Sequence, residues 1–203
     1  MRGIPFIVSA PSGAGKTTLC KMAVDFFPDL RHSISYTTRP PRDGETDGVD
    51  YRFVGDAAFD RMVERGEFLE HAGVHGKRYG TARKDLAAVI DAGLDIILDI
   101  DVQGAEKIKK TLEGGVYIFI LPPSVEECER RLKTRAKDSP EEIEKRLRIA
   151  LEEIRKAPAY EYIIINERLE EAFEKLKSVI VAERSKSARM MERVRKLFGA
   201  RRD

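Results

Sequence analysis

The chain has 203 residues, of which 42% are hydrophobic and 35% charged, and its net charge is +2. This length suits one well-packed core with small appended lobes, and the composition argues against intrinsic disorder. No apolar run approaches the roughly 20 residues that a membrane-spanning helix needs, and the nearly neutral charge gives no support for a nucleic-acid-binding class. Cys20 and Cys128 lack metal-type spacing, which predicts free thiols in a reducing cytoplasm.

The first predicted element is a buried strand at residues 4–10, because this apolar run is short and is followed by Pro and Gly. A helix follows within residues 15–27 and ends before Pro28. Three further buried strands are predicted at residues 93–104, 115–124 and 159–166. Helical patterns fall at residues 83–92, 103–111, 124–135, 140–156 and 167–197. Strands that alternate with helices predict a parallel α/β sheet with right-handed crossovers.

Two segments interrupt this alternation. Residues 34–82 carry short strand-like pieces around one helix, for which Asp56 is the expected N-cap. Residues 127–153 are almost entirely charged helix, and Ser139 followed by Pro140 predicts the start of its second half. We therefore expect an inserted α+β lobe at 34–82 and a helical lid at 127–153. The core domain is expected to comprise residues 1–33, 83–126 and 154–203.

The stretch SAPSGAGKTTL, residues 9–19, nearly fits the phosphate-binding pattern G-x-x-x-x-G-K-[S/T]. Ala10 stands where the pattern has its first glycine, but the residue before a proline is held extended, and alanine adopts that conformation without strain. A plain strand-to-helix turn would also contain glycines. The strand before the loop and the Gly15-Lys16-Thr17 triplet favour a nucleotide site.

Backbone N–H groups of residues 13–18 are expected to point at phosphate oxygens, supported by the helix N-terminus. Lys16 would add a charge between the β- and γ-phosphates, and the Thr17 hydroxyl would bind Mg²⁺. ATP is the co-substrate that such a loop implies. The loop residues predicted to bind it are Ser12, Gly13, Ala14, Gly15, Lys16, Thr17 and Thr18.

Arg39 and Arg42 lie three residues apart in a proline-stiffened loop, TTRPPRDGETDGVDYRF. Guanidinium groups in a fixed loop suit a phosphate dianion. Two loop arginines alone are more often solvated surface residues. Together with a phosphate-binding loop, they favour a phosphorylated acceptor.

Five segments follow one another in the order and spacing of guanylate kinases, and the chain resembles that family over about residues 4–182. The resemblance implies a P-loop NTPase-type parallel sheet flanked by helices, with an inserted nucleoside-monophosphate-binding lobe and a helical lid. It implies Mg²⁺-dependent transfer of the ATP γ-phosphoryl group to GMP, and to dGMP. The segments are SAPSGAGKTTL, SISYTTRPPRDGETDGVDYRFV, GEFLEHAGVHGKRYGT, ILDIDVQG and PPSVEECERRLKTR.

The resemblance also assigns an acceptor site. The residues matched to the GMP phosphate are Arg39, Arg42, Tyr51 and Tyr79. Those matched to the guanine base are Ser35, Glu70, Thr81 and Asp101. Guanine N1–H and its amino group need carboxylate acceptors, and its O6 needs hydroxyl donors, which agrees with this set. Asp99 is expected on the same strand face as Asp101, near the phosphates and, through water, near Mg²⁺.

On the donor side, the resemblance matches the lid arginines Arg131, Arg135 and Arg146, and places Asn166 near the adenine. Together with Lys16 and Arg39, these arginines are expected to be the catalytic residues. A GMP phosphate is largely ionised at neutral pH, with a second pKa of about 6, so no general base is required.

Two other interpretations stay open at this point. A non-enzymatic guanylate-kinase-like interaction module is disfavoured by Lys16, and a kinase for another nucleoside monophosphate is disfavoured by Glu70 and Asp101. The basic C-terminal segment, with Met190, Val194, Leu197 and Phe198 on one predicted helix face, fits a packed helix extension or a contact to a second subunit or RNA. Sequence leaves monomer and homodimer equally open, and nucleic acid is not expected as a partner.

Overall fold

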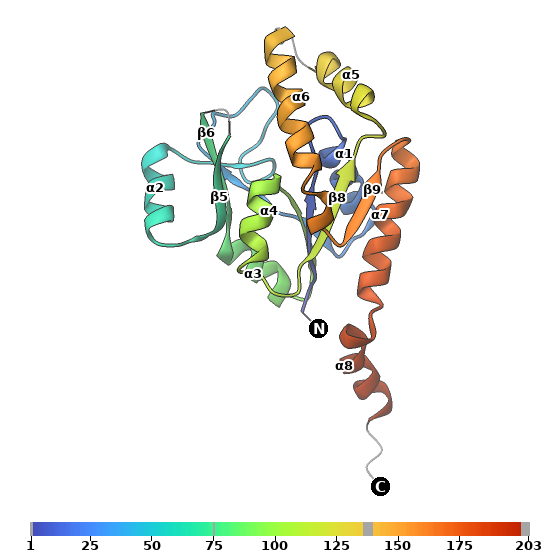
Figure 1. Ribbon diagram of the computed structural model, residues 1–203. Helices are drawn as coiled ribbons and strands as arrows, with labels where there is room; N and C mark the ends of the chain where they lie inside the picture. Colours follow the sequence, from blue (N-terminus) through green and yellow to red (C-terminus); the bar gives the residue numbers. More distant parts are fainter. Residues whose placement is uncertain (1, 75, 136–139, 200–203) are drawn as a thin grey trace.

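The computed structural model describes residues 2–74, 76–135 and 140–199. Within them, a five-stranded parallel sheet has the strand order β2-β7-β1-β8-β9 and helices on both faces (Figure 1). Its strands are β1 (Pro5–Ser9), β2 (Leu30–His32), β7 (Asp95–Asp99), β8 (Val116–Leu121) and β9 (Tyr162–Ile165). The predicted fold class, a parallel sheet flanked by helices, is confirmed.

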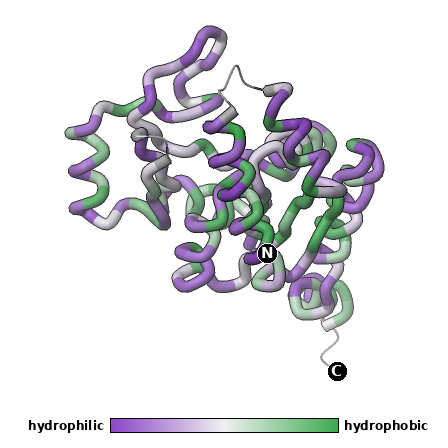
Figure 2. Tube along the Cα trace, turned by 45° about the horizontal axis from the view of Figure 1, so that its top comes forward, coloured by the Kyte–Doolittle hydropathy of each residue, from purple (hydrophilic) through white to green (hydrophobic). Residues whose placement is uncertain are grey.

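Alternate residues of β1 point to opposite faces of this sheet, as the strand period of two requires. Phe6 and Val8 pack with helices α1 and α7, whereas Ile7 packs with α3 and α4. Hydrophobic segments gather in the sheet and hydrophilic ones along the outer helices (Figure 2). The helices are α1 (Lys16–Phe26), α2 (Asp56–Glu64), α3 (Arg83–Asp91), α4 (Val102–Lys109), α5 (Val125–Arg135), α6 (Pro140–Ile154), α7 (Leu169–Arg184), α8 (Ser187–Phe198) and the 3-10 turn η1 (Ala157–Ala159).

The inserted segment forms its own four-stranded sheet among the described residues, in the order β4-β3-β6-β5. Helix α2 covers it through Phe59, which packs on Phe68. The expectation that Asp56 caps α2 is wrong. Gly55 is the N-cap, and Asp56 is the first helical residue, where its carboxylate pairs with the Arg78 guanidinium at 2.8 Å. The strands are β3 (Tyr36–Thr37), β4 (Arg52–Phe53), β5 (Phe68–Val74) and β6 (Lys77–Ala82).

Helices α5 and α6 lie side by side above the carboxyl end of the core sheet and run in roughly opposite directions (Figure 1). They have a small hydrophobic cluster of their own, in which Cys128 and Leu132 of α5 meet Leu147 and Ala150 of α6. Helix α6 begins at Pro140, as expected, but the predicted N-cap, Ser139, lies outside the described residues.

The single helix predicted over residues 167–197 is instead two helices, α7 and α8. The break falls at Ser185, whose hydroxyl donates to the Val181 carbonyl at 2.8 Å, and at Lys186, whose backbone is extended. The same kind of bond, from the Ser178 hydroxyl to the Glu174 carbonyl at 2.8 Å, lies inside α7 without ending it, so the change of backbone conformation at Lys186 marks the break. Helix α8 extends away from the core (Figure 1), and it buries none of its own residues against the part of the chain that the structure describes.

Along the described ranges, no helix is both long enough and apolar enough to cross a lipid bilayer.

Candidate active site

The loop between β1 and α1 leads into the N-terminus of α1, where the first backbone N–H groups have no partner within the helix. Gly13 and Gly15 have φ angles of 87° and 90°, a left-handed conformation that favours glycine. Gly15 is the N-cap of α1, and no side chain among the described residues caps the helix there. The first turn of α1 carries no acidic residue, and the hydroxyl-bearing Thr17 and Thr18 are exposed on it. Free N–H groups at a helix N-terminus attract anions, so this loop is built to receive phosphate.

Asn166, at the end of β9, supports the loop directly. Its side-chain Nδ2 donates to the Ala14 carbonyl at 2.8 Å, and the residue is buried. A Cβ at Gly15 would lie 2.5 Å from the same Nδ2, so only glycine leaves room for this contact. The structure thus places the Asn166 amide against the loop backbone, and its role beside the adenine stays a prediction.

Lys16, Thr17 and Asp99 form a connected group where β1 and β7 end. The Lys16 ammonium lies 2.6 Å from Asp99 Oδ1 and donates to the Ile100 carbonyl at 2.7 Å. Burial alone would raise the pKa of Asp99, but the Lys16 ammonium and the Thr17 hydroxyl together hold it below its ordinary value. The group therefore carries an ionised carboxylate beside the loop.

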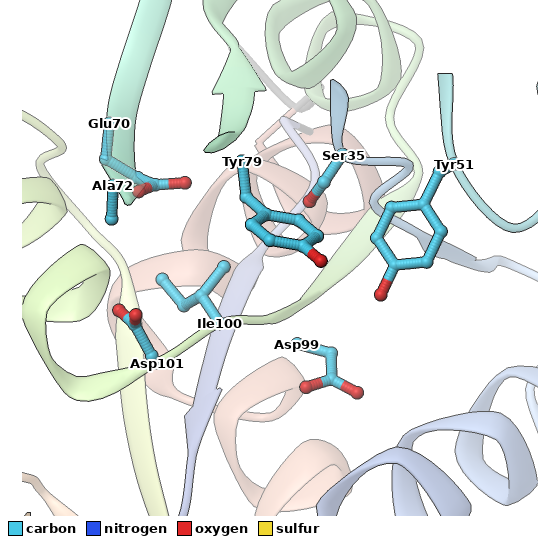
Figure 3. A pocket seen from close by; sticks show the side chains of 8 residues that line it. All are labelled: Ser35, Tyr51, Glu70, Ala72, Tyr79, Asp99, Ile100 and Asp101. Carbon is cyan, nitrogen blue, oxygen red and sulfur yellow. The ribbon is translucent and has the colours of Figure 1, made fainter. Parts of the chain in front are cut away.

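A pocket of about 190 Å³ lies between the two sheets (Figure 3). Glu70 and Asp101 lie at one end of it, and Tyr51 and Asp99 lie toward the other. Its lining is Ser35, Tyr51, Glu70, Ala72, Tyr79, Asp99, Ile100 and Asp101. Six of the residues predicted to hold GMP are therefore brought together in one pocket.

Glu70 is the most enclosed acid of this pocket. It is only 7% exposed, and its Oε1 accepts a hydrogen bond from the Thr81 hydroxyl at 2.8 Å. Burial raises the pKa of Glu70, and the nearby Asp101 adds to the rise, whereas the bond from Thr81 opposes it. A desolvated carboxylate of this kind gains most from a ligand that donates hydrogen bonds.

The prediction that Asp101 lies on the same strand face as Asp99 is wrong. Strand β7 ends at Asp99, and Asp101 is the N-cap of α4, where its Oδ1 accepts from the Gly104 N–H at 2.7 Å. The preference of aspartate for this helix position explains the difference. A Cβ at Gly104 would lie 3.0 Å from Glu70 Oε2 and 3.2 Å from Asp101 Oδ1, so glycine lets both acids converge on α4.

Arg39 is held by a residue that the sequence interpretation missed, Glu45. Two guanidinium nitrogens of Arg39 donate to Glu45 at 2.7 and 2.9 Å, and the Arg42 N–H donates to the same carboxylate at 2.8 Å. These bonds, first those from Arg39, lower the pKa of Glu45 to about 2. The Arg39 guanidinium also lies over the Tyr51 ring, 5.2 Å from its centroid. The signal that could have identified Glu45 is an acid inside a loop that otherwise presents arginines.

The predicted acceptor arginines differ in their surroundings. Arg39 is half-buried and tied to Glu45, whereas the Arg42 side chain is exposed at the rim. A second cavity, of about 610 Å³, connects this rim with the phosphate loop, because its lining includes Lys16, Thr17 and Glu45. It shares Ser35, Tyr51 and Asp99 with the smaller pocket. The loop and the acceptor pocket are thus parts of one cleft.

The predicted lid residues reach the same loop from α5 and α6. Arg131 donates to Glu127 at 2.6 Å and to the Asn166 carbonyl at 3.2 Å, and Arg146 donates to the Ser12 hydroxyl at 3.0 Å. A cavity of about 290 Å³ is lined by Gly13 and Gly15 of the loop and by Arg130, Arg131 and Thr134 of α5. The side chain of Arg135 lies outside the described residues.

The comparisons with known proteins agree with this geometry. A family model described as guanylate kinase matches residues 2–183. The guanylate kinase of Geobacter metallireducens is 54% identical over 196 residues, covering 97% of both chains, and that of Geobacter sulfurreducens is 53% identical with the same coverage. The crystal structure of guanylate kinase from Anaplasma phagocytophilum superposes with a TM-score of 0.76 at 35% identity, covering 98% of this chain and 97% of the other. The chain therefore belongs to the guanylate kinase family.

Proposed function

We infer that this chain transfers the γ-phosphoryl group of ATP to GMP, giving ADP and GDP. The observation that carries this inference is the pocket in which Glu70 and Asp101 converge at one end, while the other end adjoins Asp99 and the phosphate loop. Guanine presents two donors, N1–H and its amino group, that match two carboxylates. Adenine presents an acceptor at N1 and would leave a buried carboxylate unpaired.

The acceptor phosphate would lie toward Arg39, Tyr51 and Tyr79. The two tyrosine rings lie 5.9 Å apart, and the Arg39 guanidinium stacks over one of them. This arrangement offers a fixed cation and two phenolic hydroxyls to a dianion. We propose Arg42, exposed at the rim, as a further contact that forms when the lobe closes.

Phosphoryl transfer in this site depends on positioning and charge neutralisation. The attacking oxygen of GMP is already ionised, and Lys16 neutralises charge on the transferred group. Arg131 and Arg146 already lie at the edge of the loop, and we propose that they turn toward the phosphates, with Arg135 as the third lid arginine.

The loop also offers ligands that fit Mg²⁺. The Thr17 hydroxyl and the Asp99 carboxylate are hard oxygen donors that contact one another, and Mg²⁺ prefers such donors together with water and phosphate. When bound, the ion would neutralise charge on the β- and γ-phosphates. We propose Thr17 as the direct ligand and Asp99 as a ligand through water.

We propose three units: the core (residues 1–33, 83–126 and 154–203), the GMP-binding lobe (34–82) and the lid (127–153). The lobe has its own sheet, and the lobe and the lid each have their own hydrophobic cluster, so either could move as a unit. Their closure over both nucleotides would exclude water and suppress hydrolysis of ATP.

We also propose that the protein works in the cytoplasm on free nucleotides, as a monomer or homodimer and without nucleic acid. Cys20 and Cys128 are both buried free thiols, which agrees with a reducing compartment. Light scattering on the purified chain would measure its oligomeric state.

The test is ADP release, in a coupled assay with ATP and Mg²⁺, for GMP, dGMP, AMP, CMP and UMP. We expect turnover with GMP, lower or comparable turnover with dGMP, and little with the other three. A preference for AMP or CMP would contradict the guanine assignment. Absence of ATP binding would instead identify a non-enzymatic module.

A further inference from the structure

Asn166, which follows β9, is fixed by the core sheet and directs its side chain at the phosphate loop. Its backbone N–H donates to the Leu121 carbonyl of β8 at 2.8 Å. Its side-chain Nδ2 donates to the Ala14 carbonyl, also at 2.8 Å, and only 5% of the residue is exposed. The amide therefore has a fixed place, and from there it holds one particular carbonyl of the loop.

The Ala14 carbonyl shares a peptide plane with the Gly15 N–H. This peptide is trans, and the carbonyl and N–H of a planar trans peptide point in opposite directions. A bond that holds the carbonyl toward Asn166 therefore holds the N–H on the other side. Glycine at position 15 permits many backbone conformations, so the loop sequence alone does not fix the orientation of this peptide. The contact with Asn166 fixes it.

The main-chain carbonyl of Asn166 contacts the lid. It accepts a hydrogen bond from the Arg131 guanidinium of α5 at 3.2 Å. Arg131 and Gly15 line the same cavity of about 290 Å³ beside the loop. Asn166 thus holds two groups that border this cavity, the loop peptide through its side chain and the lid arginine through its main chain.

We propose that Asn166 is a positioning residue that keeps the Ala14–Gly15 peptide in the orientation that presents the Gly15 N–H to a nucleotide phosphate. It acts through the loop, so its effect on binding is the same whatever base the nucleotide carries. The contact with adenine that the family resemblance implies is the alternative, because an amide in that role would distinguish one base from another. The inference rests on the proposed function, since it assumes that the loop binds ATP.

The experiment compares Asn166→Leu with wild type. Leucine has nearly the shape of asparagine but cannot donate a hydrogen bond. Calorimetry with Mg²⁺ measures the binding of ADP and of inorganic tripolyphosphate, which has no base. Steady-state kinetics give kcat/KM for ATP and for inosine triphosphate as donors, together with KM for GMP.

We expect Asn166→Leu to weaken the binding of ADP and of tripolyphosphate by the same factor, about tenfold, because the loop peptide loses the hydrogen bond that orients it. The ratio of kcat/KM between ATP and inosine triphosphate should stay within about twofold of wild type, and so should KM for GMP. The matched control is Gln103→Leu, which removes an amide from an exposed position on α4 and should leave both binding affinities unchanged.

Three results would overturn the proposal. Loss of ADP binding with unchanged tripolyphosphate binding, or loss of the preference between ATP and inosine triphosphate, would assign the amide to the base. Binding of ADP by Asn166→Leu at wild-type strength would remove Asn166 from the loop's function. Equal losses for ADP and GMP with a lower Tm would indicate general destabilisation.

If Asn166→Leu does not fold, Asn166→Ser takes its place, because its hydroxyl is too short to reach the Ala14 carbonyl from the same backbone position. Where tripolyphosphate binds wild type too weakly for calorimetry, the ratio between the two donor nucleotides decides. A wild-type chain that binds ADP and tripolyphosphate but does not phosphorylate GMP would contradict the proposed function alone. The titrations would still decide the role of Asn166.

Discussion

The Lys16 ammonium lies 2.6 Å from the Asp99 carboxylate, so the cation expected to meet a phosphate has an anionic partner within the protein. Both side chains are largely buried, which makes their pairing necessary, since an isolated charge would be strongly destabilising there. We expect a bound triphosphate to compete with Asp99 for the Lys16 ammonium, and a divalent cation to compensate the charge of that carboxylate.

Lys16→Ala should reduce kcat by roughly 10²–10³-fold, the range for loss of one group that stabilises transition-state charge. The variant should also bind ADP with Mg²⁺ more weakly. The far-ultraviolet circular dichroism spectrum should stay unchanged, whereas Tm should fall, because Asp99 loses its buried cationic partner. The control is Lys175→Ala on α7, an exposed lysine whose removal should alter neither quantity. Turnover by Lys16→Ala close to the wild-type rate would refute the role of the loop.

Glu70→Gln tests how the guanine base is read. The substitution replaces one carboxylate oxygen with a donor in a pocket where the base itself donates, so kcat/KM for GMP should fall by about 10²–10⁴-fold. KM for ATP should change little, since the ATP loop lies at the other end of the cleft. Glu64→Gln, on an exposed face of α2 in the same lobe, is the control. Unchanged selectivity for GMP over AMP in Glu70→Gln would remove Glu70 from base recognition.

Most of the core sheet could be predicted because the sequence signal of a strand lies within a single short segment. Four of its five strands are short apolar runs, and the helices between them carry their own period, so their parallel direction follows from alternation. Strand β2 (Leu30–His32) has no apolar run and was not predicted, and the strand order was not predicted either. The phosphate loop is likewise local, since glycine at positions 13 and 15, Lys16 and Thr17 act within one turn of chain. These features depend little on distant contacts.

The residues that sequence reasoning missed act through contacts between distant segments. Glu153 is one of several acids on α6, and only its burial near Asp101 in the folded chain distinguishes it from the others. Asp101 was assigned to a strand face because the apolar run continues to Ile100, yet its side chain caps α4. Helices α7 and α8 are predicted as one helix because no Gly or Pro stands between them, and the backbone changes conformation at Lys186 without such a signal.

Glu45→Gln should raise KM for GMP by about five- to tenfold and leave KM for ATP unchanged. The carboxylate orients the Arg39 guanidinium through two hydrogen bonds, and an amide can keep only one acceptor oxygen for them. Arg39 would then spend less time in the orientation that suits a phosphate. Asp43→Asn, an exposed position in the same loop, serves as control. An effect of Glu45→Gln on kcat with no change in KM for GMP would assign Glu45 a different role.

Glu153 makes a pH-dependent contribution to stability whose sign can be worked out. Its pKa is raised from 4.5 to about 7 in the folded protein, so the folded state binds the proton more tightly than the unfolded chain. This contribution is fully present below pH 4.5 and is lost as pH rises through about 7. The wild type should therefore lose stability relative to Glu153→Gln between pH 5 and about pH 8, measured by denaturant unfolding at each pH.

Glu152→Gln separates this effect from a change in net charge, since it removes the same charge from an exposed site and should track the wild-type profile. A constant difference between wild type and Glu153→Gln from pH 5 to about pH 8 would mean that Glu153 titrates like an exposed acid. Burial and the neighbouring Asp101 carboxylate would then not raise the pKa of Glu153.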